Sequence, residues 1–259
     1  KDNFANSSST HHFGQSINEK AKEAREQIAD FINADSNEII FTSGATEAIN
    51  IAIKGVAESY FSKGKHIITV STEHKAVLDT CKDLERKGFE VTYLPVQKNG
   101  LVDLAEFEKS IRPDTILVSV MHVNNETGVI QPIKEISKIA HKSGVLFMTD
   151  ATQAVGKIEI DVNELGVDLL CFSGHKMYAP KGIGALYVRN KIKLTPQNHG
   201  GGHEQGLRSG TLNVPGIIAF AKACEIANQE MKQNEKTISD LRNELETELL
   251  KLPNTSLNG

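Results

Sequence analysis

The feature of this 259-residue chain that most restricts its fold is a regular alternation of short apolar runs with helical segments. Seven runs have the length of buried strands, and most are separated by segments whose apolar residues recur every three or four positions. Such alternation predicts βαβ units and a mostly parallel sheet with helices on both faces. The runs are EIIFT, HIITV, FEVTYLPV, TILVSVMHV, VLFMT, DLLCF and GALYV, and the fourth is expected to be the longest strand.

One connection is too short for a purely parallel sheet. The segment SGHKMYAPKGI, between the last two runs, is shorter than the dozen or more residues that a parallel crossover requires. GALYV is therefore expected to run antiparallel to its predecessor. The predicted fold is an α/β domain built on a seven-stranded, mostly parallel sheet with one antiparallel strand.

Composition restricts the classes of function. Lys and Arg total 29 against 33 Asp and Glu, and neither basic runs nor aromatic stripes suggest a nucleic acid or an anionic membrane as partner. No apolar run approaches the ~20 residues that span a bilayer, and no signal peptide is visible at the start. Cys81, Cys171 and Cys224 form no metal or disulfide pattern, so a reducing, cytoplasmic setting without a metal site is expected.

Lys176 is the strongest candidate for a chemical role. It follows the apolar run that ends at Phe172, so we expect it past the carboxyl end of a strand, where open α/β sheets bind ligands. A lysine half-sheltered at that edge loses hydration of its ammonium and becomes a usable nucleophile. Such a lysine can form a Schiff base with an aldehyde cofactor.

A carboxylate is expected at the same edge of the sheet. Asp150 ends the run VLFMTD, as Lys176 follows the run DLLCF. Pyridoxal phosphate (PLP) needs a lysine for its aldehyde and a carboxylate that keeps its ring nitrogen protonated. Taken singly, a surface lysine and a helix-capping aspartate would be the ordinary interpretation. Together the two residues favour a PLP site, with both of them catalytic.

The motif SGATEAIN follows a strand and opens a helix. Free N–H groups in a first helical turn, together with the helix dipole, form an anion-binding site. Ala45 and Thr46 are the candidate donors to the cofactor phosphate, and Ser173 and His175 beside the lysine are expected to complete the site. Taken alone, this motif is better explained by an ordinary helix start with Ser43 as its N-cap.

Further polar residues follow the other runs. His74, in STEHKAV, is placed to stack on the cofactor ring and to transfer protons, although a lone histidine near a helix start is usually solvated. Gln153 and an asparagine of the pair NN after the fourth run can bind the phenolic oxygen of the ring, or serve as a solvent-facing residue and a turn former. In the loop GGGHEQGLRSGT, Arg208 and Thr211 are candidates for phosphate contacts, the alternative being a disordered loop tip.

The wording and order of these motifs resemble one family. SGHK followed by GIGALYV, with DATQAVGK upstream, is similar to cysteine desulfurases, fold-type I PLP enzymes of the class-V aminotransferase family, over essentially the whole chain. RSGT together with KGIG resembles the branch that serves iron–sulfur cluster assembly and general sulfur supply. The resemblance implies that His74 covers the ring and that Asn125 binds its phenolic oxygen. It also implies a homodimer in which Thr211 reaches the partner's phosphate.

The resemblance further implies that L-cysteine is converted to L-alanine. Lys176 would take the α-proton, Asp150 would stabilise the carbanion, and an enzyme thiolate would take the sulfur as a persulfide for an iron–sulfur scaffold or another acceptor protein. Two alternatives remain open. The chain is either another PLP enzyme of this fold, such as an aminotransferase, selenocysteine lyase or kynureninase, or an inactive PLP-binding or dimerisation module.

The ends of the chain suggest a fragment, since it starts without methionine and stops soon after a helical pattern. Residues 1–230 are expected to form a PLP-binding large domain, with a helix from about Pro215. Residues 231–259, where Ile238 and Leu241 begin a further apolar stripe, are expected to lead as a second helix into a truncated C-terminal domain. All three cysteines have the spacing of packing residues. The resemblance therefore places the persulfide-forming cysteine and the arginine for the substrate carboxylate beyond Gly259.

Overall fold

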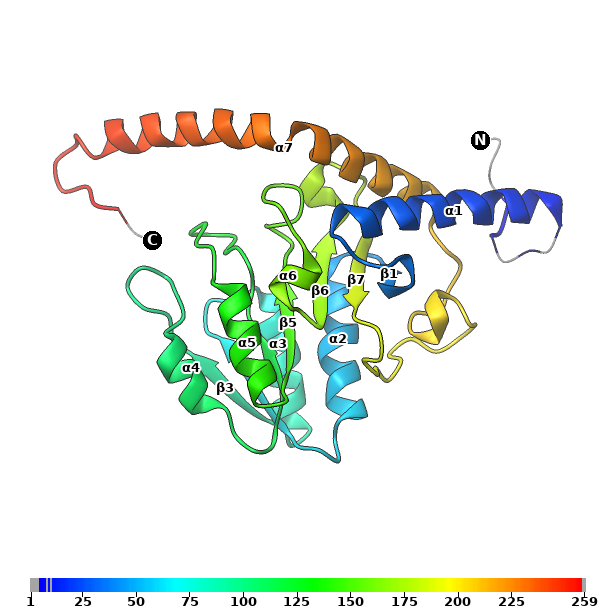
Figure 1. Ribbon diagram of the computed structural model, residues 1–259, viewed down its shortest axis with the longest axis horizontal. Helices are drawn as coiled ribbons and strands as arrows, with labels where there is room; N and C mark the ends of the chain where they lie inside the picture. Colours follow the sequence, from blue (N-terminus) through cyan, green and yellow to red (C-terminus); the bar gives the residue numbers. More distant parts are fainter. Residues whose placement is uncertain (1–4, 8, 10, 258–259) are drawn as a thin grey trace.

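A computed structural model describes residues 5–7, 9 and 11–257 of the chain. In these residues one seven-stranded sheet has the order β1-β7-β6-β5-β4-β2-β3 (Figure 1). Only β7 is antiparallel, to both of its neighbours, which confirms the predicted fold class and the antiparallel strand. The strands are β1 Ile39–Thr42, β2 His66–Val70, β3 Glu90–Leu94, β4 Thr115–Ser119, β5 Leu146–Asp150, β6 Leu169–Ser173 and β7 Gly184–Val188.

Successive side chains of the central strands enter two apolar layers, one on each face of the sheet. Ile68 and Phe147 belong to one layer, and their chain neighbours Ile67 and Met148 belong to the other. This two-residue period is the ordinary geometry of a strand. Because both faces are covered, the strands have near-continuous apolar sequences, which is why the runs were visible in the sequence.

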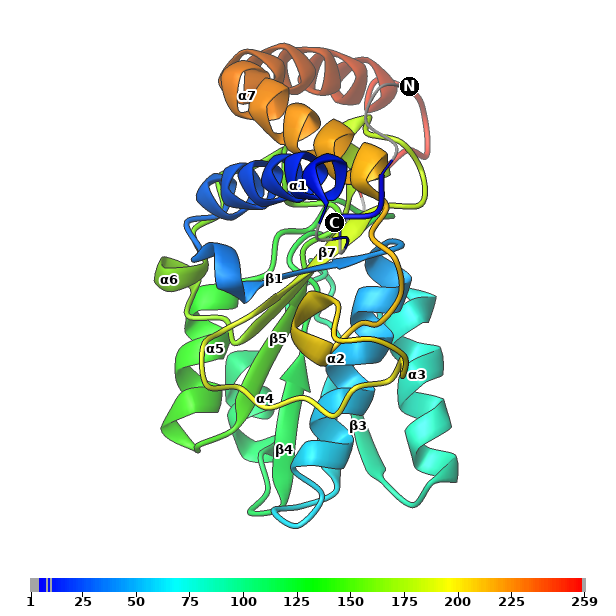
Figure 2. The ribbon, with the colours of Figure 1, turned by 90° about the vertical axis from the view of Figure 1, so that its right-hand side faces the viewer.

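Helices cover both faces, as predicted. The layer with Ile67 is covered by α2 and α3, and the other layer by α1, α4, α5, α6 and the first part of α7. Helices α1 and α7 lie side by side over one end of the sheet (Figures 1 and 2). The α-helices are α1 His12–Phe31, α2 Ala45–Ser59, α3 Lys75–Arg86, α4 Leu104–Ser110, α5 Ile133–Lys142, α6 Val162–Leu165 and α7 Val214–Leu249, and the short 3-10 helices are η1 Ser36–Glu38, η2 Gly174–Met177 and η3 Glu204–Gly206.

The prediction that the fourth strand is the longest is wrong. Strand β4 ends at Ser119 and has five residues, as do β2 and β5. The backbone beyond it still follows β5, since the N–H groups of Val120 and His122 donate to the carbonyls of Met148 and Asp150. The apolar run therefore continues past the regular strand and carries the chain to the edge of the sheet.

The C-terminal region contains one continuous helix where two were predicted. Helix α7 has 36 residues, starts with Pro215 in its first turn, and contains neither Gly nor Pro after that turn. The polar stretch in its middle lacks an apolar stripe because it lies exposed to solvent. The last part of α7 extends beyond the sheet in Figure 1, and its large apolar residues are exposed: Ile238, Leu241, Leu245 and Leu249. A domain boundary at residue 230 stays a prediction.

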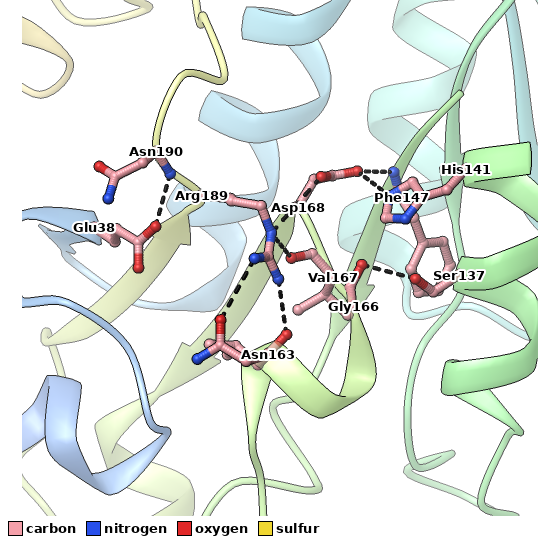
Figure 3. Close-up of polar contacts among 11 residues, drawn as sticks. Glu38, Ser137, His141, Phe147, Asn163, Gly166, Val167, Asp168, Arg189 and Asn190 are labelled. Carbon is pink, nitrogen blue, oxygen red and sulfur yellow. Dashed lines mark hydrogen bonds and ion pairs between the residues drawn. The ribbon is translucent and has the colours of Figure 1, made fainter. Parts of the chain in front are cut away.

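A polar network holds the amino ends of β5 and β6 (Figure 3). The buried Asp168 carboxylate accepts a hydrogen bond from the Phe147 N–H at 2.8 Å, and His141 Nε2 lies 2.8 Å from the same oxygen. Arg189 donates to the carbonyl of Val167 at 2.9 Å. These groups therefore satisfy one another at this edge of the sheet. The opposite, carboxyl edge has a different arrangement.

Candidate active site

The loops at the carboxyl edge of the sheet enclose a cavity of about 500 Å³. It lies where parallel α/β sheets bind ligands. Nine of the ten residues predicted to bind the cofactor line it, namely Ala45, Thr46, His74, Asn125, Asp150, Gln153, Ser173, His175 and Lys176. The tenth, Thr211, is exposed on the glycine-rich loop and does not line the cavity. The geometry therefore brings together residues that are up to 131 positions apart, from Ala45 to Lys176.

The N-terminus of α2 forms one end of the cavity. Its N-cap is Gly44 and not Ser43, and among the described residues no side chain caps the helix, which leaves the N–H groups of Ala45 and Thr46 available there for an anion. Gly44 has φ 155° and ψ 178°, a conformation available almost only to glycine. A Cβ on Gly184 of β7 would lie 2.6 Å from the Gly44 Cα, so the close approach of these two backbones also requires glycine.

Positive and hydroxyl groups stand beside this helix N-terminus. Ser173 Oγ and His175 Nδ1 are 2.8 Å apart, and a Cβ built on Gly44 would lie 3.5 Å from the same Oγ. Burial, and after it the charges of Lys176 and Lys181, lower the pKa of His175. Sequence reasoning missed Lys181, whose only signal was its place in the turn before β7. Together these groups suit a phosphate dianion.

Asp150 also lines the cavity and is buried, with 4% of its surface exposed. Its Oδ1 accepts a hydrogen bond from the Thr152 N–H at 2.9 Å. Burial raises its pKa, against the lowering effect of the Thr152 hydrogen bonds and the nearby His74. A buried carboxylate that lacks an ion pair within the described ranges fits a cationic ligand atom, such as the protonated ring nitrogen of PLP.

The side chain of His74 caps helix α3. Its Nδ1 accepts a hydrogen bond from the Ala76 N–H at 3.1 Å, which places the proton of the neutral ring on Nε2. The ring is therefore held in one orientation at the wall of the cavity. Sequence reasoning weighed a merely solvated histidine against a cofactor contact, and the cap is a third arrangement that remains compatible with the contact.

Two predicted ligands of the phenolic oxygen have partners in this structure. Asn125 Nδ2 donates to Glu126 at 2.9 Å, and Gln153 accepts a hydrogen bond from Lys157. Both residues line the cavity. Burial, and then the charge of Lys176, lower the pKa of Lys157.

Lys176 lies in η2, directly after β6, as predicted. The residue is exposed to solvent and also lines the cavity, so the expectation that it is half-sheltered from water stays a prediction. The turn of η2 carries it outward at the cavity rim, whereas the next residue, Met177, is buried. No hydrogen bond or ion pair engages the Lys176 ammonium in the part of the chain that the structure describes. An accessible and unengaged amine is what a reaction with an aldehyde requires.

Arg208, the other candidate for a phosphate contact, does not line the cavity, and its side chain is engaged by a carboxylate. Its Nε donates to Glu47 Oε1 at 2.9 Å, a partner that sequence reasoning missed. The same loop is anchored by Glu204, which accepts hydrogen bonds from Arg25 and, at 2.6 Å, from the Phe41 N–H. These pairs join residues 161 and 179 positions apart, so no local signal could have revealed them.

The three cysteines are buried, as expected for packing residues. Burial raises the pKa of Cys81 and Cys224 to about 12, and that of Cys171 well above its usual value. None of these thiols is therefore ready to act as a thiolate.

In the described ranges no group of three or more His, Cys, Asp and Glu residues is suited to hold a metal ion, and no helix is long and apolar enough to traverse a bilayer.

The fold is that of fold-type I PLP-dependent transferases. The sequence profile described as aminotransferase class-V matches residues 1–259, and the chain belongs to this family. Class-V aminotransferases and the IscS relatives below depend on PLP, which confirms the expected cofactor at the level of the family.

Curated relatives and solved structures agree with this assignment. The cysteine desulfurases IscS of Pectobacterium carotovorum and Escherichia coli O139:H28 are 56% and 54% identical over 259 residues, 99% of this chain and 64% of each relative. A NifS-like protein superposes with a TM-score of 0.95 at 44% identity, covering 98% of this chain and 70% of that one. SspA in complex with cysteine gives 0.84 at 47%, covering 87% and 65%. The chain thus spans 64% of the length of these curated relatives.

Proposed function

We propose that this chain is the PLP-binding part of a cysteine desulfurase, which converts L-cysteine to L-alanine and retains the sulfur as a persulfide. The main support for this proposal is that nine residues from separate sequence motifs line one cavity. Two further findings support the proposal. The relatives at 54–56% identity are named cysteine desulfurases, and one similar structure is described in complex with cysteine.

Three residues act on the reacting atoms. PLP, when bound, supplies an electron sink for the α-carbon of an amino acid. Asp150 keeps the proton on the ring nitrogen, because a buried carboxylate favours a cation beside it. Lys176 takes the proton from the substrate α-carbon. His74, with its Nδ1 fixed by the cap of α3, covers the ring and transfers protons through Nε2.

The remaining predicted residues bind and orient. The N–H groups at the start of α2, the Ser173 hydroxyl and the His175 imidazole hold the phosphate. Asn125 and Gln153 donate to the phenolic oxygen. Thr211, which is exposed and does not line its own cavity, completes the phosphate site of the other subunit in a homodimer.

Sulfur transfer needs a nucleophilic thiol. An enzyme thiolate attacks the substrate sulfur, the carbon–sulfur bond breaks, and its electron pair returns to carbon, which takes a proton to give alanine. The sulfur stays on the enzyme as a persulfide and passes to an iron–sulfur scaffold or another acceptor protein in the cytoplasm. Because Cys81, Cys171 and Cys224 are buried, the thiol is none of these.

The test compares the wild-type chain with two lysine variants, in PLP titrations followed by visible absorbance. Wild type and Lys82→Ala, a change of an exposed lysine that does not line the cavity, should bind PLP alike. Lys176→Ala should lose the absorbance of the lysine-linked cofactor. The protein that includes this chain should then form alanine from cysteine under excess thiol. Formation of a keto acid in place of alanine would indicate an aminotransferase and contradict the proposal.

A further inference from the structure

We propose that the ion pair between Glu47 and Arg208 is a positioning device that holds the phosphate-binding end of the cavity in shape and keeps it free of net negative charge. The inference rests on the proposed function, because the anion concerned is the phosphate of PLP. Neither residue is assigned to the reaction itself. Their role is to shape and to neutralise the site that Ala45 and Thr46 form.

The geometry shows how one carboxylate connects three segments. Glu47 Oε1 accepts from Arg208 Nε at 2.9 Å, and Glu47 Oε2 accepts from the Ser43 N–H at 2.5 Å. The side chains of Glu47 and Arg208 are 17% and 23% exposed, so water screens the pair only partly. The turn Ser43–Gly44 is thereby tied to the first turn of α2 and to the glycine-rich loop.

The charges explain why the pair is needed. Glu47 lines the cavity and lies in the first turn of α2. The positive end of the helix dipole stabilises a carboxylate at this place, but the carboxylate repels a bound phosphate dianion. Although burial raises the pKa of Glu47, the hydrogen bonds from Arg208 and Ser43 lower it overall, so the side chain is ionised at neutral pH. The guanidinium of Arg208 does not line the cavity itself, but it pairs with the Glu47 carboxylate, which does, and compensates that negative charge.

The loop delivers Arg208 from within the same chain. Asn198 and Arg208 form a backbone bridge across the loop. Glu204, with 6% of its surface exposed, is held by Arg25 and by the Phe41 N–H. The loop therefore brings Arg208 to Glu47 of the same chain.

If the ion pair only supports the structure, its loss should weaken the binding of PLP and of pyridoxal equally. If it sets the charge of the site, its loss should weaken the binding of PLP more than that of pyridoxal. Pyridoxal has the aldehyde and the ring of PLP but no phosphate. Arg208→Gln leaves the Glu47 carboxylate uncompensated and should weaken PLP binding about tenfold, less than the roughly 30-fold or more for a fully buried charge pair, because water partly screens this one. Its affinity for pyridoxal should change less than about twofold. Glu47→Gln keeps the guanidinium and should bind PLP as tightly as wild type or more tightly.

The double variant completes the test. Glu47→Gln with Arg208→Gln removes both charges and should recover most of the PLP affinity that Arg208→Gln loses. Arg112→Gln is the matched control, because it breaks the pairs of Arg112 with Glu90 and Asp114, which do not line the cavity, and should leave both affinities unchanged. An equal loss for PLP and pyridoxal in Arg208→Gln, or a double variant no better than Arg208→Gln, would overturn the inference.

Inorganic phosphate separates this inference from the proposed function. Phosphate should raise the Tm of the cofactor-free wild type, and this shift should shrink in Arg208→Gln and return in the double variant. If the phosphate-induced Tm shift behaves as expected but the wild type does not bind PLP, the proposed function is refuted and the role of the ion pair stands. If the wild type binds PLP normally but the phosphate-induced Tm shift is unaltered in Arg208→Gln, the role of the ion pair is refuted and the proposed function stands.

Discussion

Replacement of Asp150 by Asn separates the charge of this residue from its structural contact. The amide keeps an oxygen that can accept the Thr152 N–H bond of 2.9 Å, but it carries no negative charge. Burial raises the pKa of Asp150, so its ionisation opposes folding, and this cost grows as the pH rises through the folded-state pKa. At neutral pH the cofactor-free Asp150→Asn protein should therefore be as stable as wild type in thermal unfolding, or slightly more stable.

The catalytic effect should be large. Removing one partner of a buried, hydrogen-bonded charge pair costs about 2–5 kcal/mol. Asp150 is 4% exposed, so solvent screening reduces this range little. Because 1.36 kcal/mol in a barrier corresponds to about a factor of ten, exchange of the substrate α-proton should slow by roughly 30- to 5,000-fold.

The assay is deuterium incorporation at the α-carbon of alanine in D₂O, with the protein saturated by PLP. Asp103→Asn is the control, because Asp103 also accepts hydrogen bonds from backbone N–H groups, at the N-cap of α4, but lies outside the cavity. Asparagine caps helices as well as aspartate does, so this variant should exchange like wild type. Exchange in Asp150→Asn within about threefold of wild type would refute the proposed role of the charge.

Three further outcomes are expected. Borohydride reduction of the PLP-loaded protein followed by peptide mapping should label Lys176, and a label on another lysine would contradict the assignment. Mixing Lys176→Ala with Thr211→Ala should yield hybrid dimers whose one lysine-bearing site binds PLP better than the Thr211→Ala parent, since the partner supplies the missing threonine; equal affinity would exclude contact in trans. Replacing Cys81, Cys171 and Cys224 one at a time by Ala should leave the rate of alanine formation unchanged in the full-length protein, because these thiols are buried, whereas loss of turnover with unchanged thermal unfolding would identify one of them as the nucleophile.

The sequence by itself determined the architecture and the edge at which the site lies. Apolar runs long enough for strands, alternating with amphipathic segments, specify a parallel α/β sheet because each run must be buried on both faces. The connection after Phe172 is too short for a parallel crossover, and it therefore specifies that β7 is antiparallel to β6. Strand polarity then places Asp150 and Lys176 at one edge, whatever the packing elsewhere. This is why residues chosen from separate motifs line one cavity.

Only the tertiary structure decided how the side chains at that edge are engaged. Lys176 is exposed to solvent, and this exposure depends on how η2 turns and on what packs around it. Arg208 pairs with Glu47, and Glu204 with Arg25, across 161 and 179 positions of sequence. Local patterns carry information about hydrogen bonds within a few residues and about periodic burial. Contacts between distant segments arise only when the whole sheet and its loops are assembled, and these contacts set the charge and the shape of the site.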